Sequence, residues 1–186
     1  PEALLDEIEV LYLENKKLLD QKFEDVTVIH QNNLSTLVPT SLFDENELNT
    51  YLEYTIKTLA TDFVAFDALH QLDIQNVYIP YVNMNNFFFQ KFGAFDYKHH
   101  ATVLIDKLIS HAKNNSEKQF FVNVSASNFD IVVIENSKLI CYNSFTFDTK
   151  EDFIYYILFT AEQLELNPEE FLLVFIGAIE ETSELY

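Results

Sequence analysis

The pattern that most restricts the fold of this chain lies in its last third. Strand-like stretches follow one another with short polar turns between them, at residues 120–124, 129–134 and 139–147. Such close spacing predicts an antiparallel meander. Thr149, with Asp152 shortly after it, is typical of a helix start with a capping box. Residues 171–176 are apolar throughout, which predicts a central strand covered on both faces. Together these signals predict a mixed α/β fold.

The first half of the chain alternates helix and strand signals. The predicted helices cover residues 3–19, a stretch after Asp44, and residues 83–92, and the predicted strands cover 26–30, 35–38, 63–69 and 76–80. Asn32 and Asn33 are typical of a hairpin turn, here between the first two strands. The apolar stripe of the first helix is expected to comprise Leu4, Ile8, Leu11, Leu18 and Leu19, interrupted at Asn15.

The order of elements indicates a duplication. Residues 3–30 form a helix followed by a strand, as do residues 150–176, but a three-strand meander precedes only the second copy. We infer that the first copy lacks its opening strands. The expected division follows Gly93, giving subdomains of residues 1–95 and 96–186.

Glycine and arginine, the residues best suited to phosphate chemistry, are scarce or absent. The chain has two glycines, Gly93 and Gly177, and its cations are all lysine. Phosphate loops need glycine because bare backbone N–H groups must approach the anion closely. Arginine supplies the bidentate clamp on phosphates and carboxylates. This composition therefore argues against catalysis on phosphates.

The charge balance limits the partners. The formal net charge is −19, which disfavours nucleic acid and anionic membrane surfaces. No apolar run reaches the roughly 20 residues of a membrane helix, so membrane insertion is not expected. The single cysteine, Cys141, fits a reducing compartment and reads as a small core residue. We expect a cytoplasmic protein.

Several short stretches resemble an uncharacterised family from Bacteroidetes whose members are actin-like. They are LSTLVP at 34–39, NVYIP at 76–80, NSF at 143–145, EDFIYY at 151–156 and ELY at 184–186. The resemblance extends over nearly the whole chain. It implies an actin-like tandem of two ribonuclease-H-like subdomains, the first without its N-terminal strands. The chain is also similar, more distantly, to the actin-like scaffold domains of secretion and pilus machines.

The resemblance places a degenerate phosphate turn in the second half. Actin-like ATPases carry Asp-x-Gly in the first hairpin of each half. Here Asn123 stands at the Asp position and Ser125 at the Gly position, with Ser127 in the same turn. The later glycine pair retains only Gly177, followed by Ala178. The first-half loop would precede Pro1. The departures imply no catalytic residues and no cofactor.

Aromatic residues gather on two predicted helices. The candidate interaction residues are Phe87, Phe88, Phe89, Phe92, Tyr155 and Tyr156. Consecutive helical positions such as 87–89 spread over about 200° of the helix surface, so one core face cannot cover all of them. The cluster therefore lies at the junction between the halves, which is the favoured interpretation, or forms a binding patch.

The other candidate sites have simpler explanations. His99, His100 and His111 are the one histidine cluster, but their helical spacing does not suit a single metal ion. The acidic pairs 169–170 and 180–181 are typical of a solvated surface in so acidic a chain. No metal site is expected.

Three functional hypotheses follow. The leading one is a non-catalytic, actin-like scaffold or adaptor that binds an unidentified protein. The second is an actin-like ATPase whose phosphate site depends on residues before Pro1. The third is an acidic module that binds a basic protein.

Overall fold

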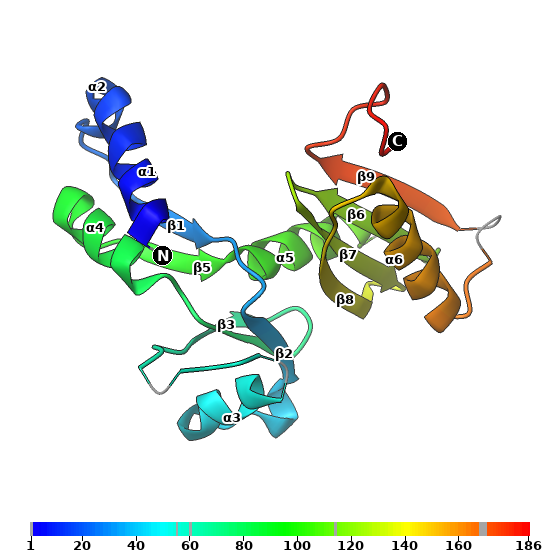
Figure 1. Cartoon of the computed structure of the whole chain (residues 1–186). Helices are drawn as coiled ribbons and strands as arrows, with labels where there is room; N and C mark the ends of the chain where they lie inside the picture. Colours follow the sequence, from blue (N-terminus) through cyan, green and yellow to red (C-terminus); the bar gives the residue numbers. More distant parts are fainter. Residues whose placement is uncertain (1, 55, 60, 114, 168–170) are drawn as a thin grey trace. The chain divides into compact units, whose positions relative to one another are not determined.

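The structure forms two compact units. This computed structural model describes residues 2–54, 56–59, 61–113, 115–167 and 171–186. Unit 1 ends at Leu104 and unit 2 begins at Ile105 (Figure 1). Each unit is described by itself below.

The boundary between the units falls inside helix α5 (His100–Ala112), later than the division predicted after residue 95. The difference arises from a non-local pairing. Strand β5 (Asp96–His99) lies parallel to β1 (Thr27–His30), with Thr27 opposite Asp96. Because its partner is an early strand, β5 belongs to unit 1.

Unit 2 contains the predicted meander. Its strands are β6 (Gln119–Val124), β7 (Asn128–Glu135), β8 (Lys138–Thr146) and β9 (Leu172–Gly177), in the sheet order β8-β7-β6-β9. The first three are antiparallel, and β9 runs parallel to β6. In the described sheet β9 lies at an edge and is half-buried, so the prediction of a central strand is wrong.

Helix α6 (Lys150–Gln163) covers one face of this sheet (Figure 1). The predicted capping box is present: the Asp152 amide donates to Thr149 Oγ1 at 3.1 Å, and the Thr149 amide donates to Asp152 Oδ2 at 3.0 Å. The helix ends before Asn167, and Glu165 adopts a positive φ of 54°. The sequence predicts a helix stop at Asn167-Pro168, since proline cannot continue a helix, but Pro168 lies outside the described residues.

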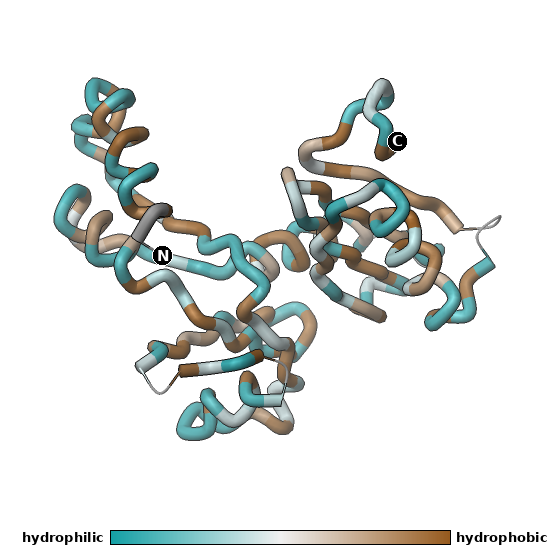
Figure 2. Tube along the Cα trace, viewed as in Figure 1, coloured by the Kyte–Doolittle hydropathy of each residue, from teal (hydrophilic) through white to brown (hydrophobic). Residues whose placement is uncertain are grey.

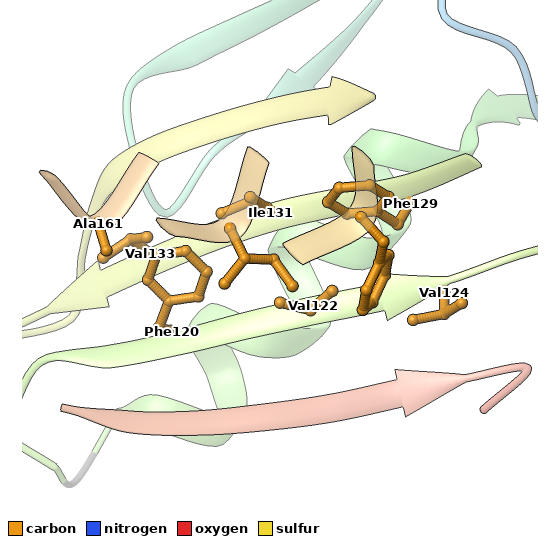
Figure 3. Close-up of a cluster of buried hydrophobic side chains, with 9 residues drawn as sticks. Phe120, Val122, Val124, Phe129, Ile131, Val133 and Ala161 are labelled. Atoms are coloured by element: carbon orange, nitrogen blue, oxygen red, sulfur yellow. The ribbon is translucent and has the colours of Figure 1, made fainter. Parts of the chain in front are cut away.

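A hydrophobic core separates α6 from the sheet. Figure 3 shows its side chains on one face of β6 and β7: Phe120, Val122, Val124, Phe129, Ile131 and Val133. Phe153, Ile157 and Ala161 of α6, whose spacing of four residues is typical of one helix face, are buried against them. Hydrophobic residues accordingly concentrate along these strands (Figure 2).

Unit 1 begins with a broken helix. Helices α1 (Glu2–Glu14) and α2 (Lys16–Leu19) are separated at Asn15, whose side chain donates to the Leu11 carbonyl at 2.9 Å. Tyr12 is the buried residue of α1, whereas three members of the predicted stripe are exposed: Leu4, Leu11 and Leu18. The predicted stripe is therefore wrong at these positions: α1 buries the face with Tyr12 rather than Leu4 and Leu11, and Leu18 lies beyond the break at Asn15.

The second sheet of unit 1 has the order β2-β4-β3. Its antiparallel strands are β2 (Ser35–Pro39), β3 (Ala65–Leu69) and β4 (Ile74–Tyr78), followed by helix α4 (Val82–Phe92). Between β2 and β3 lie two 3₁₀ turns, η1 (Thr40–Leu42) and η2 (Glu45–Glu47), and helix α3 (Leu48–Glu53). Val38, Leu52, Val77 and Ile79 form its core.

The predicted hairpin at Asn32 is wrong. Strand β1 pairs with β5, and β2 pairs with β4. The Asn32 side chain donates to the Ile79 carbonyl at 3.0 Å and accepts from the Leu34 amide at 2.8 Å. Asn32 thus anchors the chain as it passes from one sheet to the other.

Candidate functional site

The degenerate phosphate turn lies at the end of β6, where Asn123 is paired with Asp130 of β7. Asn123 Nδ2 donates to Asp130 Oδ2 at 3.1 Å, and the Tyr142 hydroxyl donates to Asp130 Oδ1 at 3.1 Å. Asp130 is fully buried. Burial and the negative charge of Asp130 raise the pKa of Tyr142, so its hydroxyl stays a donor. Both carboxylate oxygens are therefore engaged inside the protein.

Two backbone donors at this turn are also engaged. The Ser125 amide donates to the Asn128 carbonyl at 2.8 Å. The Ala178 amide, which follows Gly177, donates to the Val124 carbonyl at 2.7 Å. Ser125 is half-buried and Ser127 is exposed. The N–H groups of Ser125 and Ala178, which could otherwise face a phosphate, are therefore bonded to the chain itself.

Gly177 has a structural reason to be glycine. Its φ is 86°, and a Cβ there would collide with the Val124 carbonyl oxygen and lie 3.0 Å from Asn123 Oδ1. Asn123, Ser125 and Gly177 thus come together at one end of the β6–β9 pair, as the resemblance implies. The glycine allows β9 to approach β6 closely.

Unit 1 contains a buried polar cluster of the same kind around Asp67 on β3. The Tyr78 hydroxyl donates to Asp67 Oδ1 at 3.2 Å. Oδ2 accepts from the His99 amide and from Thr102 Oγ1, each at 2.8 Å. Asn76, paired with Asp67 across the strands, donates to Thr102 Oγ1 at 2.9 Å. Burial and the Asp67 charge raise the pKa of Tyr78.

Sequence reasoning missed both carboxylates. The available signal was an aspartate inside a strand with an asparagine opposite it: Asp67 with Asn76, and Asp130 with Asn123. A carboxylate held by such fixed donors is a structural acceptor, because the donors already occupy its oxygens.

The histidines do not assemble a metal site. His99 is buried, its Nδ1 accepts from the Ala101 amide at 3.2 Å, and its Nε2 lies 3.1 Å from the Asn32 carbonyl oxygen. His100 contacts the His99 ring, whereas His111 is exposed in unit 2. Among the residues that the structure describes, no three His, Cys, Asp or Glu side chains are grouped to hold a metal ion.

The two acidic pairs lie differently. Glu180 and Glu181 are exposed, and the pair at 169–170 lies outside the described residues. Cys141 is half-buried against the core of unit 2, and burial raises the pKa of its thiol.

Most of the phenylalanine cluster packs within unit 1. Tyr12 of α1 contacts Phe87 and Phe92 edge-on, with centroids 5.8 and 6.2 Å away. Phe88 is half-buried and stacks on Phe92. Phe89 alone of the four is largely exposed, at 62%. Packing within unit 1 thus buries Phe87 and partly buries Phe88 and Phe92.

An apolar groove of about 500 Å³ lies beside this cluster. Its lining comes from α1, α2, β1 and α4, and includes Ile8, Leu19, Val28, Phe88 and Phe92. Phe88 and Phe92 thus line this groove as well as packing on α1 and on each other.

The tyrosine pair on α6 divides between core and surface. Tyr156 stacks on Phe145 of β8, with centroids 4.6 Å apart. Tyr155 is 58% exposed and stacks on Phe159 at 5.9 Å. Ile154 and Leu158 are exposed beside them. These four residues, Ile154, Tyr155, Leu158 and Phe159, are called the α6 patch below.

The fold defines the class of protein. The chain superposes on a crystal structure from Bacteroides thetaiotaomicron VPI-5482, described as a protein with actin-like ATPase fold and unknown function. The TM-score is 0.85 at 21% sequence identity, over 96% of this chain and 69% of that chain. The fold is therefore actin-like, as predicted.

The chain belongs to the family described as protein of unknown function DUF3822, whose model matches residues 1–186. A chain of the PilM–PilN type IV pilus biogenesis complex is a weaker structural match, with a TM-score of 0.43, 16% identity, and coverage of 90% of this chain and 53% of that one. The comparison with curated proteins gives no significant match. In the described part of the chain, no helix has the length and apolarity needed to cross a membrane.

Proposed function

We propose that the chain is a non-catalytic, cytoplasmic, actin-like module that acts as a protein-interaction scaffold or adaptor. The observation that carries this proposal is the internal bonding of the phosphate turn. Asp130 is held by Asn123 and Tyr142, and the Ser125 amide is bonded to Asn128.

Binding of a nucleotide at this turn would be energetically unfavourable. The Ser125 and Ala178 amides would have to exchange short backbone bonds for bonds to phosphate. The net charge of −19, without a single arginine, would repel the polyphosphate. Stabilising a phosphoryl-transfer transition state needs preorganised donors and cations. Residues 123–128 include no cationic side chain, and the Ser125 amide is already bonded to Asn128.

The surface supports protein binding. The α6 patch places four large apolar side chains side by side on one helix. Exposed apolar residues that gather in this way mark interaction sites in soluble proteins. A folded protein is also a better partner for this acidic chain than nucleic acid is.

The test is calorimetric titration of the purified chain with Mg-ATP, combined with a phosphate-release assay. We expect neither stoichiometric binding nor turnover. The matched variant carries Asn123→Asp and Ser125→Gly, which restore the Asp-x-Gly pattern. It is expected to remain inactive because a carboxylate at position 123 would face the buried Asp130 across the strand pair, with no cationic side chain in the turn to offset the two charges. A tight one-to-one complex of the wild-type chain, with turnover abolished by altering Ser125 or Gly177, would establish the ATPase instead.

A further inference from the structure

The apolar groove of unit 1 follows the open edge of strand β1. Residues 25–29 line it in succession, and none of the described residues of β5 is part of its lining. Since β5 pairs with one edge of β1, the groove lies along the other edge, with which no strand of the described chain pairs. Ile8 and Leu19, from the helices before β1, also line it. The groove is thus an unpaired strand edge flanked by apolar side chains.

Unit 2 fills the corresponding space with strands. Helix α6 and strand β9 follow one another along the chain as α1 and β1 do. Strand β6 pairs in parallel with one edge of β9, and its Phe120, Val122 and Val124 pack with Phe153 and Ile157 of α6. The meander that begins with β6 therefore occupies the space beneath the helix and beside the strand. In unit 1 the space beside β1 is the groove.

Helix α1 carries apolar side chains suited to packing on such a meander. Leu4 and Leu11 lie about 40° and 60° around the helix from Ile8, on the side away from Tyr12, and both are exposed. Tyr12 makes the contact with α4. Leu11 lines a second apolar groove together with Ile8 and Leu19. The exposed leucines therefore belong to a helix face that has no sheet to pack on among the described residues.

We propose that the groove of unit 1 holds a three-stranded antiparallel meander formed by residues that precede Pro1 in the same polypeptide. The first strand of this meander pairs in parallel with the open edge of β1, as β6 does with β9. Its apolar side chains pack on Ile8, Leu11 and Leu19. The inference concerns how unit 1 is completed and does not depend on the scaffold function.

The connection in unit 2 explains why the same polypeptide is the expected source. Strand β8 ends at Thr146 and α6 begins at Lys150, so the meander leads into its helix through a short turn. A segment that ends just before α1 reaches the groove in the same way and needs no partner chain. The actin-like structure from Bacteroides thetaiotaomicron also extends beyond the superposed part, since the match covers 69% of that chain.

The test uses the polypeptide as its gene encodes it, in its native cells. A photo-cross-linking residue, p-benzoylphenylalanine, replaces Leu11, or replaces Val10 as the control. The two side chains are equally exposed, at 56% and 55%, but Val10 lies about 160° around α1 from Ile8 and so points away from the groove. We expect position 11, and not position 10, to cross-link within one polypeptide to a residue before Pro1. A cross-link from position 11 to a second copy or to another protein, or none at all, would overturn the inference, as would a gene that encodes nothing before Pro1.

Hydrogen exchange gives a second measurement that needs no substitution. The Asp96 amide donates to the Val26 carbonyl, so the alternation of a parallel ladder directs the amides of Thr27 and Ile29 to the open edge. We expect these two amides to exchange at least about tenfold more slowly in the encoded polypeptide than in residues 1–186, because the meander accepts hydrogen bonds from them. The amide of Val122, on a strand of unit 2 paired at both edges, should exchange equally in both. Equal rates for Thr27 and Ile29 in the two chains would show that no strand covers this edge.

Discussion

The hydroxyl of Tyr142 donates to Oδ1 of the buried Asp130 at 3.1 Å. Tyr78 makes the corresponding bond to Asp67 in unit 1 at 3.2 Å. In each unit the tyrosine comes from the strand next to the aspartate, two residues from the directly opposite position. The same tyrosine–aspartate bond therefore occurs in both units, at a buried carboxylate in unit 2 and at a half-buried one in unit 1.

Removing the Tyr142 hydroxyl should destabilise unit 2. Tyr142→Phe leaves the ring in place but takes one donor from a buried carboxylate, which costs about 1–3 kcal/mol of the free energy of unfolding. Urea denaturation followed by circular dichroism measures the loss. Tyr155→Phe is the control, because its exposed side chain should change stability by less than about 0.5 kcal/mol. Equal effects of the two substitutions would show that the bond to Asp130 contributes nothing.

The elements that sequence predicts well are those with local causes. Helix α6 has its cap at Thr149 and a buried stripe through Phe153 and Ile157, all within one stretch of chain. The meander of β6, β7 and β8 follows from closely spaced strand-like stretches and short polar turns. Periodicity and capping chemistry are local, so these elements could be predicted without knowing any neighbour.

The elements that sequence predicts poorly depend on distant partners. The β1–β5 pairing joins two strands that come, in the sequence, before and after all the strands of the β2-β4-β3 sheet. This pairing places the end of unit 1 beyond the predicted division. The roles of Asp67 and Asp130 depend on tyrosines from neighbouring strands, which an isolated strand pattern does not reveal. For the candidate site, the resemblance located Asn123, Ser125 and Gly177, but only coordinates show that their surroundings are already bonded.

The two glycines allow a controlled test of whether the close approach of β9 to β6 requires glycine at position 177. Both have positive φ, 77° for Gly93 and 86° for Gly177, so alanine at either position is strained by about 1–3 kcal/mol. A Cβ at Gly93 meets no atom within 4 Å, whereas one at Gly177 collides with the Val124 carbonyl. We therefore expect Gly177→Ala to lower the free energy of unfolding more than Gly93→Ala does. If urea titrations gave the two variants equal losses in the free energy of unfolding, the close approach of β9 to β6 would not explain the glycine at position 177.

Stability should fall in mild acid through His30. Its side chain is buried, Nδ1 accepts from the Tyr81 amide at 3.4 Å and Nε2 lies 2.9 Å from Asn85 Oδ1. Burial lowers the pKa of His30 below 6.5. As the pH falls, the unfolded chain therefore binds a proton on this histidine at a higher pH than the folded chain does. The stabilising contribution of His30 is complete above pH 6.5 and decreases as the pH falls toward the folded-state pKa.

Urea titrations at about pH 8 and about pH 5 measure this slope. His30→Gln removes the titrating group and should flatten the slope. His70→Gln, at an exposed histidine, should leave the slope as it is. An unchanged slope in His30→Gln would show that other groups cause the acid sensitivity.

The capping box at the start of α6 should contribute measurably, because this helix covers the core of unit 2. Thr149→Ala removes the acceptor of the Asp152 amide, and the loss of such a cap costs about 1 kcal/mol. Thr149→Ser keeps the acceptor oxygen and should retain most of the stability. Thr182→Ala, at an exposed threonine near the C-terminus, should have no measurable effect on the urea midpoint. If Thr149→Ser were as destabilised as Thr149→Ala, the methyl group of Thr149, rather than its hydroxyl, would be what stabilises the helix start.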